Sequence, residues 1–280
     1  MSEFQKVIKY LAIGFAAFIA LSIITGIATG LMALTGVLSG GGSGNVIDVN
    51  KSFEDVKSIS VNHSVGKLTI KLGNTDEVEV IAENVDDDFT AEKNFSGDLK
   101  IKSRFNFWNF LGGNNNFNNK SQITILIPED FVAENIRIDA GAGNVTLDDI
   151  ITKKLDINAG TGNIEGTNII ADKVKLDGGV GEIDFEQVKF TDVDIDSGVG
   201  NISLQGQLFG RNKIDCGIGE VDLNLLGSSD DYYIKVDKGL GNINIDGQKY
   251  SNINWNNMTA DNTLDINGGV GNIDINFDEN

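Results

Sequence analysis

The tripeptide Gly-x-Gly recurs at a regular interval in the second half of the chain, and this recurrence constrains the fold more than any other feature. The steps between the first glycines of successive copies are 19, 19, 19, 19, 22 and 30 residues. A constant interval near 20 residues is typical of a solenoid, in which each repeat forms one coil. We interpret the two longer steps as insertions. The corner glycines are Gly141, Gly143, Gly160, Gly162, Gly179, Gly181, Gly198, Gly200, Gly217, Gly219, Gly239, Gly241, Gly269 and Gly271.

Residues on either side of each Gly-x-Gly alternate between apolar and polar. Counted from the first glycine as position 0, positions −3 and +4 hold Ile, Leu or Val in every copy. This period of two predicts strands with one buried face. Glycine at both corner positions indicates backbone conformations closed to residues with a Cβ, or close approach of a neighbouring backbone. We therefore predict an all-β fold, a single-chain parallel β-solenoid of about 19-residue coils.

Position −4 favours stacking of the coils in register and in chain order. It reads Arg137, Asp156, Lys175, Asp194 and Lys213, so the sign of the charge alternates. Coils about 4.8 Å apart would place each charge beside opposite charges. The alternation ends with a lysine at position 235, where the spacing first departs from 19 residues.

Position −2 holds Asp or Asn in every copy and has two interpretations. These side chains can hydrogen-bond the backbone of the following corner. They can also form a column of metal ligands, for which the weak candidates are Asp177, Asp196, Asp215 and Asp237. We predict no cofactor, with calcium as an open alternative. The calcium-roll repeat itself does not fit, because Ile183 takes the place of the ligand Asp and Asp184 falls on the opposite strand face.

The strand after each corner is the candidate functional surface. Its outward positions +3, +5 and +7 contain no Lys or Arg in any of the seven coils. Such a surface suits divalent cations, basic polymers or peptides, or hydroxyl-rich glycans. The alternative is that it serves solubility and prevents lateral aggregation. The candidate binding residues are Glu165, Glu182, Asp184, Glu186, Glu220, Asp222 and Asp246.

The N-terminal region predicts a retained membrane anchor. No charged residue occurs between Tyr10 and Gly44, and about 20 apolar residues suffice to span a bilayer. We predict a transmembrane helix over residues 10–38, a cytoplasmic tail over 1–9 and a Gly/Ser linker over 39–47. The lysines of the tail place the N-terminus in the cytoplasm and the rest of the chain outside, in a single-pass cell-membrane protein.

Ser22, Gly26 and Gly30 form a row of small residues in this segment. Such a row can bring two membrane helices close together, so a homodimer through the helix is one interpretation. Small residues are also common in membrane helices that do not pair.

Residues 48–127 predict further, irregular β coils that cap the regular solenoid of residues 128–280. The stretch HSVGKLTI at residues 63–70 resembles a degraded corner. Between two strands lies an Asn-rich loop, residues 104–121, which contains four Phe and one Trp. These aromatic residues either cover the open end of the core or contact membrane or a partner.

Composition excludes several classes of protein. The formal net charge of −19 makes nucleic acid an unsuitable partner. One cysteine cannot form an intramolecular disulfide, and we interpret Cys216 as a small packing residue. His63 is the one histidine, and no nucleophile and base arrangement accompanies it. We therefore expect no enzyme and no catalytic residues, although a glycosidase-like pair of carboxylates is a third alternative.

The stretch SQITILIPEDFVAENIRIDAGAGNVTL, residues 121–147, resembles the bacterial putative-adhesin family, a domain of unknown function. The resemblance covers roughly residues 50–280. It implies an anchored β-solenoid on a bacterial envelope of Gram-positive type, and some relatives are associated with envelope-stress systems. The family supplies no catalytic or binding residues to transfer.

These observations together predict a non-enzymatic, membrane-anchored, extracytoplasmic solenoid that acts as an adhesin-like or cell-envelope binding surface. The expected partners are the membrane, through residues 10–38, and a cell-wall polymer or an envelope protein. The alternative is an accessory or regulatory protein of an envelope-stress response system.

Overall fold

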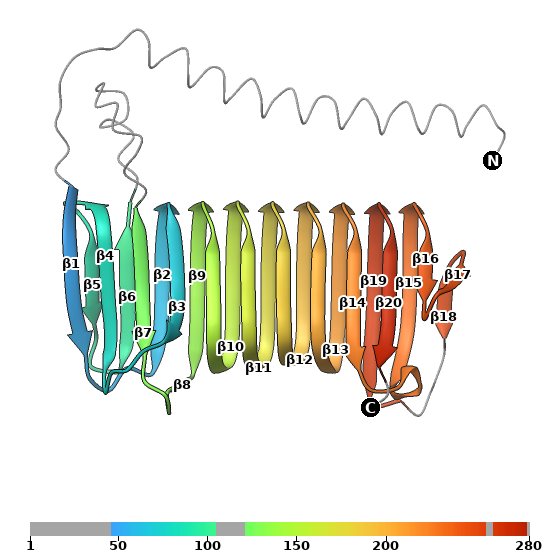
Figure 1. Ribbon diagram of the computed structural model, residues 1–280, viewed down its shortest axis with the longest axis horizontal. Coiled ribbons are helices and arrows are strands. Elements are labelled where there is room, and N and C mark those ends of the chain that lie inside the picture. The colour runs from blue at the N-terminus through green and yellow to red at the C-terminus, as the bar shows by residue number, and fades with distance from the viewer. Residues whose placement is uncertain (1–45, 105–120, 256–259, 279–280) are drawn as a thin grey trace, which may run out of the picture. The chain divides into compact units, whose positions relative to one another are not determined.

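The computed structural model describes residues 46–104, 121–255 and 260–278, which form one all-β solenoid (Figure 1). Twenty strands make up a single continuous sheet. The prediction of an all-β solenoid with parallel strands is confirmed. The elements are β1 (Val46–Phe53), β2 (Ser58–Val65), β3 (Lys67–Leu72), β4 (Val78–Asp86), β5 (Thr90–Lys93), β6 (Asp98–Ser103), β7 (Gln122–Ile127), β8 (Val132–Ala133), β9 (Asn135–Ala142), β10 (Val145–Thr161), β11 (Ile164–Val180), β12 (Ile183–Val199), β13 (Ile202–Ile218), β14 (Val221–Leu226), the 3-10 helix η1 (Ser229–Asp231), β15 (Tyr232–Leu240), β16 (Ile243–Ile245), β17 (Gln248–Tyr250), β18 (Ile253–Trp255), β19 (Asn262–Val270) and β20 (Ile273–Asp278).

Two predicted features lie outside the described residues. They are the N-terminal region, including the membrane helix at 10–38, and residues 105–120 of the aromatic loop. Within the described ranges, no helix has the length and apolar character needed to cross a bilayer.

The central coils follow the 19-residue repeat closely. Strands β10 to β13 each run for 17 residues, from one Gly-x-Gly corner to the next. They pair in parallel, so that Ile157 lies beside Leu176 and Leu176 beside Ile195. Each coil has two edges: the corner edge, where the Gly-x-Gly tripeptides lie, and the return edge, where the chain turns back at about position +8. At the return edge Asp149 and Asn168 adopt left-handed backbone conformations, with φ of 55° and 54°.

The hydrophobic core runs along the inside of the coils. Every residue at positions −3 and +4 of the seven corners is 0 to 1% exposed, as the period of two predicts. Burial of each such side chain contributes on the order of 2 kcal/mol. Within the coil formed by β12, the rings of Phe185 and Phe190 meet edge to face, with 5.6 Å between their centroids.

Glycine is required at the corners because successive backbones nearly touch there. Gly200 has φ of 146°, and a Cβ built on it would lie 1.7 Å from the carbonyl oxygen of Gly181 in the adjacent coil. At the first corner position, a Cβ on Gly198 would lie 2.6 Å from the carbonyl oxygen of Gly179. Both reasons offered by the sequence, the conformation and the close approach, therefore act together.

The last coils do not stack in chain order, and that part of the prediction is wrong. Strand β19 lies between β13 and β15 and pairs in parallel with both, and β20 likewise lies between β14 and β16 (Figure 1). The coil around Gly269 is thus inserted between the coils around Gly217 and Gly239. Extra residues before β15 let the chain skip one rung of about 4.8 Å, and extra residues before β19 let it return to fill that rung.

The N-terminal coils show the same exchange. Strand β2 lies between β6 and β9, and β3 lies between β7 and β10, although β6 and β7 come later than β2 and β3 in the chain. The degraded corner is in register with the regular coils, because Val65 pairs with Ala142.

Antiparallel strands close both ends of the parallel ladder. At the N-terminal end β4 pairs with β7, β1 pairs with β4, and β5 pairs with β6. At the C-terminal end β17 pairs with β16 and β18 with β15. Short antiparallel edge strands limit the pairing of further chains onto an open sheet edge.

Candidate functional site

The strands before each corner carry a face on which cations pair with part of the carboxylates; we call positions −4 and −2 of these strands the paired face. These positions hold four cations and eight carboxylates in the seven coils. Arg137 Nη1 lies 3.4 Å from Asp156 Oδ2 in the next coil. Asp156 in turn pairs in register with Lys175. The predicted contact between position −4 of adjacent coils is therefore confirmed.

The exchange of the last two coils extends this alternation to the end of the solenoid. In spatial order Lys213 is followed by Asp265 and then by Lys235. The Nζ atom of Lys235 lies 3.3 Å from Oδ1 of Asp265. The break that the sequence showed at position 235 thus results from reading the coils in chain order.

Position −2 adds an ion pair within several of these strands, although in one coil both positions are acidic, Asp194 and Asp196. Lys175 Nζ lies 2.6 Å from Asp177 Oδ2, and Lys235 Nζ lies 3.1 Å from Asp237 Oδ2. Lys213 and Asp215 form the same pair. Two coils with Asp at −4 hold Asn at −2, namely Asn158 and Asn267.

Ion pairing on this face shifts the titration of its members. The hydrogen bond that Lys175 donates to Asp177 raises the pKa of the Lys175 ammonium, and Lys235 shows the same effect with Asp237 and Asp265. Burial alone would raise the pKa of Asp215, but hydrogen bonds from Lys213 and Asn267 outweigh it and lower that pKa. Lys213 and Asp215 are therefore both charged at neutral pH.

This arrangement bears on the weak metal candidates at position −2. Three of them, Asp177, Asp215 and Asp237, direct a carboxylate oxygen at a lysine two residues upstream. Asn267 donates a hydrogen bond of 2.7 Å to Asp215. Asp196 is exposed and stacks between Asp177 and Asp215. Within the described ranges, no group of three or more His, Cys, Asp or Glu side chains is placed to hold a metal ion.

The strands after each corner carry the acidic face, defined as positions +3, +5 and +7. Glu165 and Asp184 lie beside each other in adjacent coils. Glu182 and Glu186 lie on either side of Asp184 in the same coil, and both are exposed. Among the described residues, none of these carboxylates has an ion-pair partner within 4.0 Å. The acidic face thus presents negative charge that the described part of the chain does not neutralise.

Further along the acidic face, neutral amides rather than cations accompany the carboxylates. Asn272 donates a hydrogen bond of 3.3 Å to Glu220, and Asn224 donates one of 3.1 Å to Asp222. These contacts orient the carboxylates and leave their charge in place.

Asp246 differs from the other six candidates. It forms, with Gly247, the two-residue turn between β16 and β17, where both residues have positive φ, 48° and 75°. Its Oδ1 accepts a hydrogen bond of 2.8 Å from the backbone N–H of Phe277. The structure therefore gives Asp246 a role in a turn, which the position of this residue in the repeat did not indicate.

The Asn residues at position +3 have a structural function. Oδ1 of Asn144 accepts a hydrogen bond of 3.3 Å from the backbone N–H of Asn163, and Oδ1 of Asn163 accepts one of 3.2 Å from Glu182. Asn201 repeats the contact with Glu220 at 3.0 Å. This ladder satisfies one backbone donor per coil just after the corner.

Two buried groups next to corners were singled out by the sequence. His63 occupies position −1 of the degraded corner, is 2% exposed, and neither ring nitrogen has a hydrogen-bond partner in the described part of the chain. Burial lowers its pKa to about 4, so the ring is neutral at pH 7. Cys216 occupies the same position of another coil, is 3% exposed, and burial raises the pKa of its thiol. These two coils hold a neutral group at this inner position, whereas the coil of Gly239 has Lys238 there.

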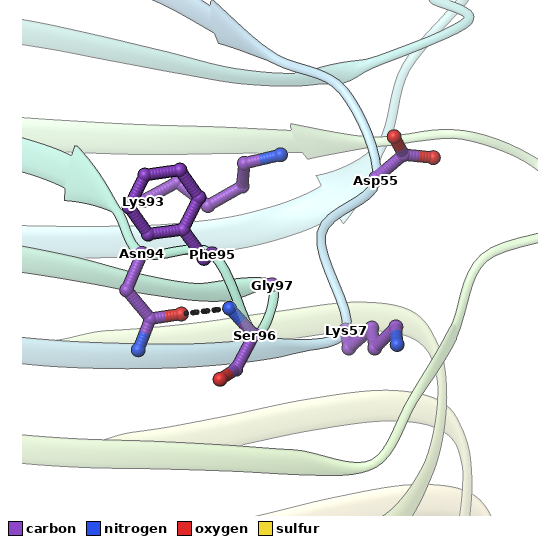
Figure 2. Close-up of a pocket in the computed structure, with 7 residues that line it drawn as sticks. All are labelled: Asp55, Lys57, Lys93, Asn94, Phe95, Ser96 and Gly97. Carbon is purple, nitrogen blue, oxygen red and sulfur yellow. Dashed lines mark hydrogen bonds between the residues drawn. The ribbon is translucent and has the colours of Figure 1, made fainter.

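One hollow on the surface lies away from both faces, at the turn between β5 and β6 (Figure 2). Its walls are Asp55, Lys57 and the turn residues 93–97. Asn94 shapes the turn by accepting a hydrogen bond of 2.9 Å from the backbone N–H of Ser96, and Phe95 projects fully into solvent. The hollow contains a single carboxylate, so it does not offer the pair of acids that a glycosidase uses.

The fold and these surfaces define a class of protein: a single-chain β-solenoid with one face of ion pairs and one acidic face. Residues 56–280 match the family model described as Toastrack DUF4097. The chain belongs to this Toastrack family. The resemblance to an adhesin-like family of unknown function is thereby confirmed.

Several solved structures are similar to the chain. One is described as a putative cell adhesion protein from Clostridium sporogenes ATCC 15579, with 21% identity over 84% of this chain and 100% of that chain, and a TM-score of 0.41. Another is described as a putative adhesin from Bacteroides fragilis NCTC 9343, with 14% identity over 84% of this chain and 98% of that chain, and a TM-score of 0.31. A third, from Parabacteroides distasonis ATCC 8503, has 14% identity over 83% of this chain and 98% of that chain, and a TM-score of 0.33. No curated protein matches the chain at a significant level.

Proposed function

We propose that this protein is a non-enzymatic, membrane-anchored solenoid that binds a component of the cell envelope through its acidic face. The observation that supports this most directly is the difference between the two faces. The paired face holds Arg and Lys side chains that form ion pairs with part of its carboxylates, for example Lys175 with Asp177. The acidic face has no Lys or Arg in its outward columns, so Glu165, Glu182 and Asp184 retain their charge.

The acidic face has the dimensions and chemistry of a polymer-binding surface. Its rows repeat once per coil, about every 4.8 Å, along the length of the solenoid. The carboxylates attract amino groups, and the amides that accompany them, such as Asn224 and Asn272, donate and accept hydrogen bonds. A partner with regularly spaced ammonium and hydroxyl or amide groups is complementary to this arrangement. Amino-sugar and peptide-bearing wall polymers have this composition.

The anchoring part of the proposal rests on the sequence. Residues 10–38 are apolar and uncharged, with lysines before them and the acidic domain after them. The word adhesin in the names of the similar structures describes those proteins, and our proposal for this chain rests on its charge distribution.

The test compares a neutralised acidic face with a matched control. The test variant is Glu182→Gln, Asp184→Asn, Glu220→Gln and Asp222→Asn in the full chain. The control removes four exposed carboxylates elsewhere, by Asp87→Asn, Asp88→Asn, Glu129→Gln and Asp172→Asn. Both variants lose the same charge, so a difference between them reports the position of the charge and not its total.

Binding is measured as co-sedimentation of the detergent-solubilised full chain with insoluble Gram-positive cell-wall material. We expect the control to bind like the unmodified chain and the test variant to bind at least about tenfold more weakly, and more salt to weaken binding. Equal binding by all three proteins would overturn the acidic face as the binding surface. If the unmodified chain does not sediment, the wall polymer is excluded.

A further inference from the structure

The middle residue of each Gly-x-Gly corner forms a feature that the charge pattern does not explain. In the five coils at the C-terminal end this residue is apolar, and register places the five side chains in one row; we call them the apolar ridge. In spatial order the ridge consists of Val180, Val199, Ile218, Val270 and Leu240. Val180, Val199 and Ile218 are 41%, 43% and 39% exposed.

The geometry of the corner makes the ridge protrude. Each ridge residue has glycine on both sides, so bare backbone flanks the row of side chains. The side chains at positions −2 and +3 of these coils are Asp, Asn or Glu. A cation, Lys238, lies at position −1 of one coil and donates a hydrogen bond to the carbonyl oxygen of Gly241. A row of half-exposed branched side chains in an otherwise acidic surface is typical of a contact surface.

The chain enters the solenoid at this same edge. Val46, the first described residue, pairs with Asp86, and Glu83 of the same strand pairs with Gln122, which lies just past a corner. Strand β1 therefore begins at the corner edge (Figure 1). Val46 is itself apolar and 45% exposed. The segment that precedes it contains the uncharged stretch of residues 10–44.

Chain length limits how far the Val46 end of this edge can lie from a membrane. Residues 39–45 separate the apolar stretch from Val46. Seven residues span at most about 25 Å when fully extended. The ridge lies further along the same edge, and it meets the bilayer at high effective concentration when the solenoid lies along the membrane.

We propose that the corner edge rests on the outer surface of the bilayer, with the apolar ridge at the level of the lipid headgroups. This inference rests on the proposed function, in which residues 10–38 span the membrane. The carboxylates beside the ridge, such as Asp196 and Glu220, suit zwitterionic headgroups that present ammonium groups and disfavour anionic ones. The paired and acidic faces then stand away from the membrane on either side.

A second copy of the chain is a less suitable occupant. Stable protein interfaces bury about 800 Å² on each partner, and one side chain per coil over five coils provides less than that. Two ridges in contact would also bring together acidic side chains such as Asp196 and Glu220, which have no ion pair within 4.0 Å among the described residues.

The experiment uses the full chain in phosphatidylcholine nanodiscs and one fluorescent label at a time. Cys216→Ser removes the native thiol, and Ser197 occupies the equivalent position in the next coil, so serine fits there. The test label is attached after Val199→Cys on the ridge. The control label follows Ile170→Cys at the return edge, where Ile170 is 42% exposed and apolar, as Val199 is.

The readout is quenching by phosphatidylcholine that carries a nitroxide on its headgroup. We expect the label at position 199 to be quenched at least threefold more than the label at position 170. If the two labels are quenched equally while the chain still floats with phosphatidylcholine vesicles, the contact of the corner edge with the membrane is overturned and the proposed anchor is not. Failure of the chain to float would overturn the proposed anchor and this inference with it. Pyrene excimers between copies at position 199 would show that a second chain covers the ridge, which also overturns it.

Discussion

The two edges of each coil reverse the chain in different ways. At the corner edge, two glycines let adjacent backbones nearly touch, as at Gly200 and Gly181. At the return edge of β10, β11 and β12, one residue in the left-handed region suffices, and Asp149, Asn168 and Gln187 fill that position. In β13 Gly206 fills it, with φ of 149° and a close approach to the carbonyl oxygen of Val188. The corner edge is therefore fixed by contacts between coils throughout, whereas the return edge is fixed by local conformation in three of these four coils.

This difference explains where the solenoid varies. The connections before β15 and β19, which permit the exchange of the last coils, leave the ladder at the return edge. The corner edge keeps its register through the exchange, because Gly269 packs on Gly217 and Gly239 packs on Gly269. A coil can thus be lengthened at one edge while the other holds the stack together.

The largest effect is expected from a methyl group at the corner edge. Gly200→Ala would place a Cβ 1.7 Å from the carbonyl oxygen of Gly181, in a conformation with φ of 146° that alanine rarely adopts. We expect a loss of at least about 3 kcal/mol in the free energy of unfolding, measured by urea denaturation. Asn168→Ala at the return edge should lose about 1 kcal/mol. Similar losses for the two variants would remove the distinction between the edges.

A second prediction concerns acid stability at the corner edge. The folded-state pKa of His63 is about 4, below its ordinary value of 6.5, so the unfolded chain binds the extra proton first. Stability from this residue is present above about pH 6.5 and is lost as the pH falls toward 4. The resulting fall in the free energy of unfolding amounts to about 3 kcal/mol.

The matched variant is His63→Ser, because Ser103 occupies the adjacent position of the same column. Denaturation at pH 7 and pH 4 should show a smaller fall in stability for the variant than for the unmodified chain. If the two proteins lose stability in parallel, the buried ring does not contribute to acid sensitivity.

A third prediction tests what selects the order of the coils once the return edge permits an exchange. Asp265→Lys would place three cations in a row, next to Lys213 and Lys235. We expect a loss of about 1 kcal/mol in unfolding free energy, most of it removed by 1 M salt. The control Asp261→Lys changes charge outside the column. An equal effect of both substitutions would mean that the column does not select the order.

The smallest effect has the opposite sign. Gln187 has φ of 55°, which glycine adopts without strain. Gln187→Gly at the return edge should therefore leave stability unchanged or raise it by up to about 1 kcal/mol, measured by thermal unfolding. A clear destabilisation would show that the Gln187 side chain supports the return edge, which would bring the two edges closer in character.

The sequence predicted the coil well because its signals are local. The alternation around each corner determines which residues face the core, as Ile157 and Ile195 illustrate. The column from Arg137 to Lys213 predicted register, because equal spacing leaves one way to align the coils. The acidic face followed from the same alternation, apart from Asp246, which a hairpin turn removes from the face.

The apolar ridge was missed although its residues lie inside the motif that revealed the repeat. The apolar character of Val180, Val199 and Ile218 is visible in the sequence, but their exposure follows only from the structure of the corner. The exchanged coils also left a signal. Placing Asp265 between Lys213 and Lys235 restores the alternation of charge, which the chain order interrupts.

By itself, the sequence determined the unit of this protein: a coil with two glycines at one edge, an apolar interior and two outer faces of different charge. It did so because period-2 patterning and the steric demands of glycine act over a few residues. The tertiary structure alone decided which coils are neighbours at the two ends and which carboxylates find a cation. Those outcomes depend on contacts between residues far apart in the chain, and insertions such as the one before β19 let the chain choose among several neighbours.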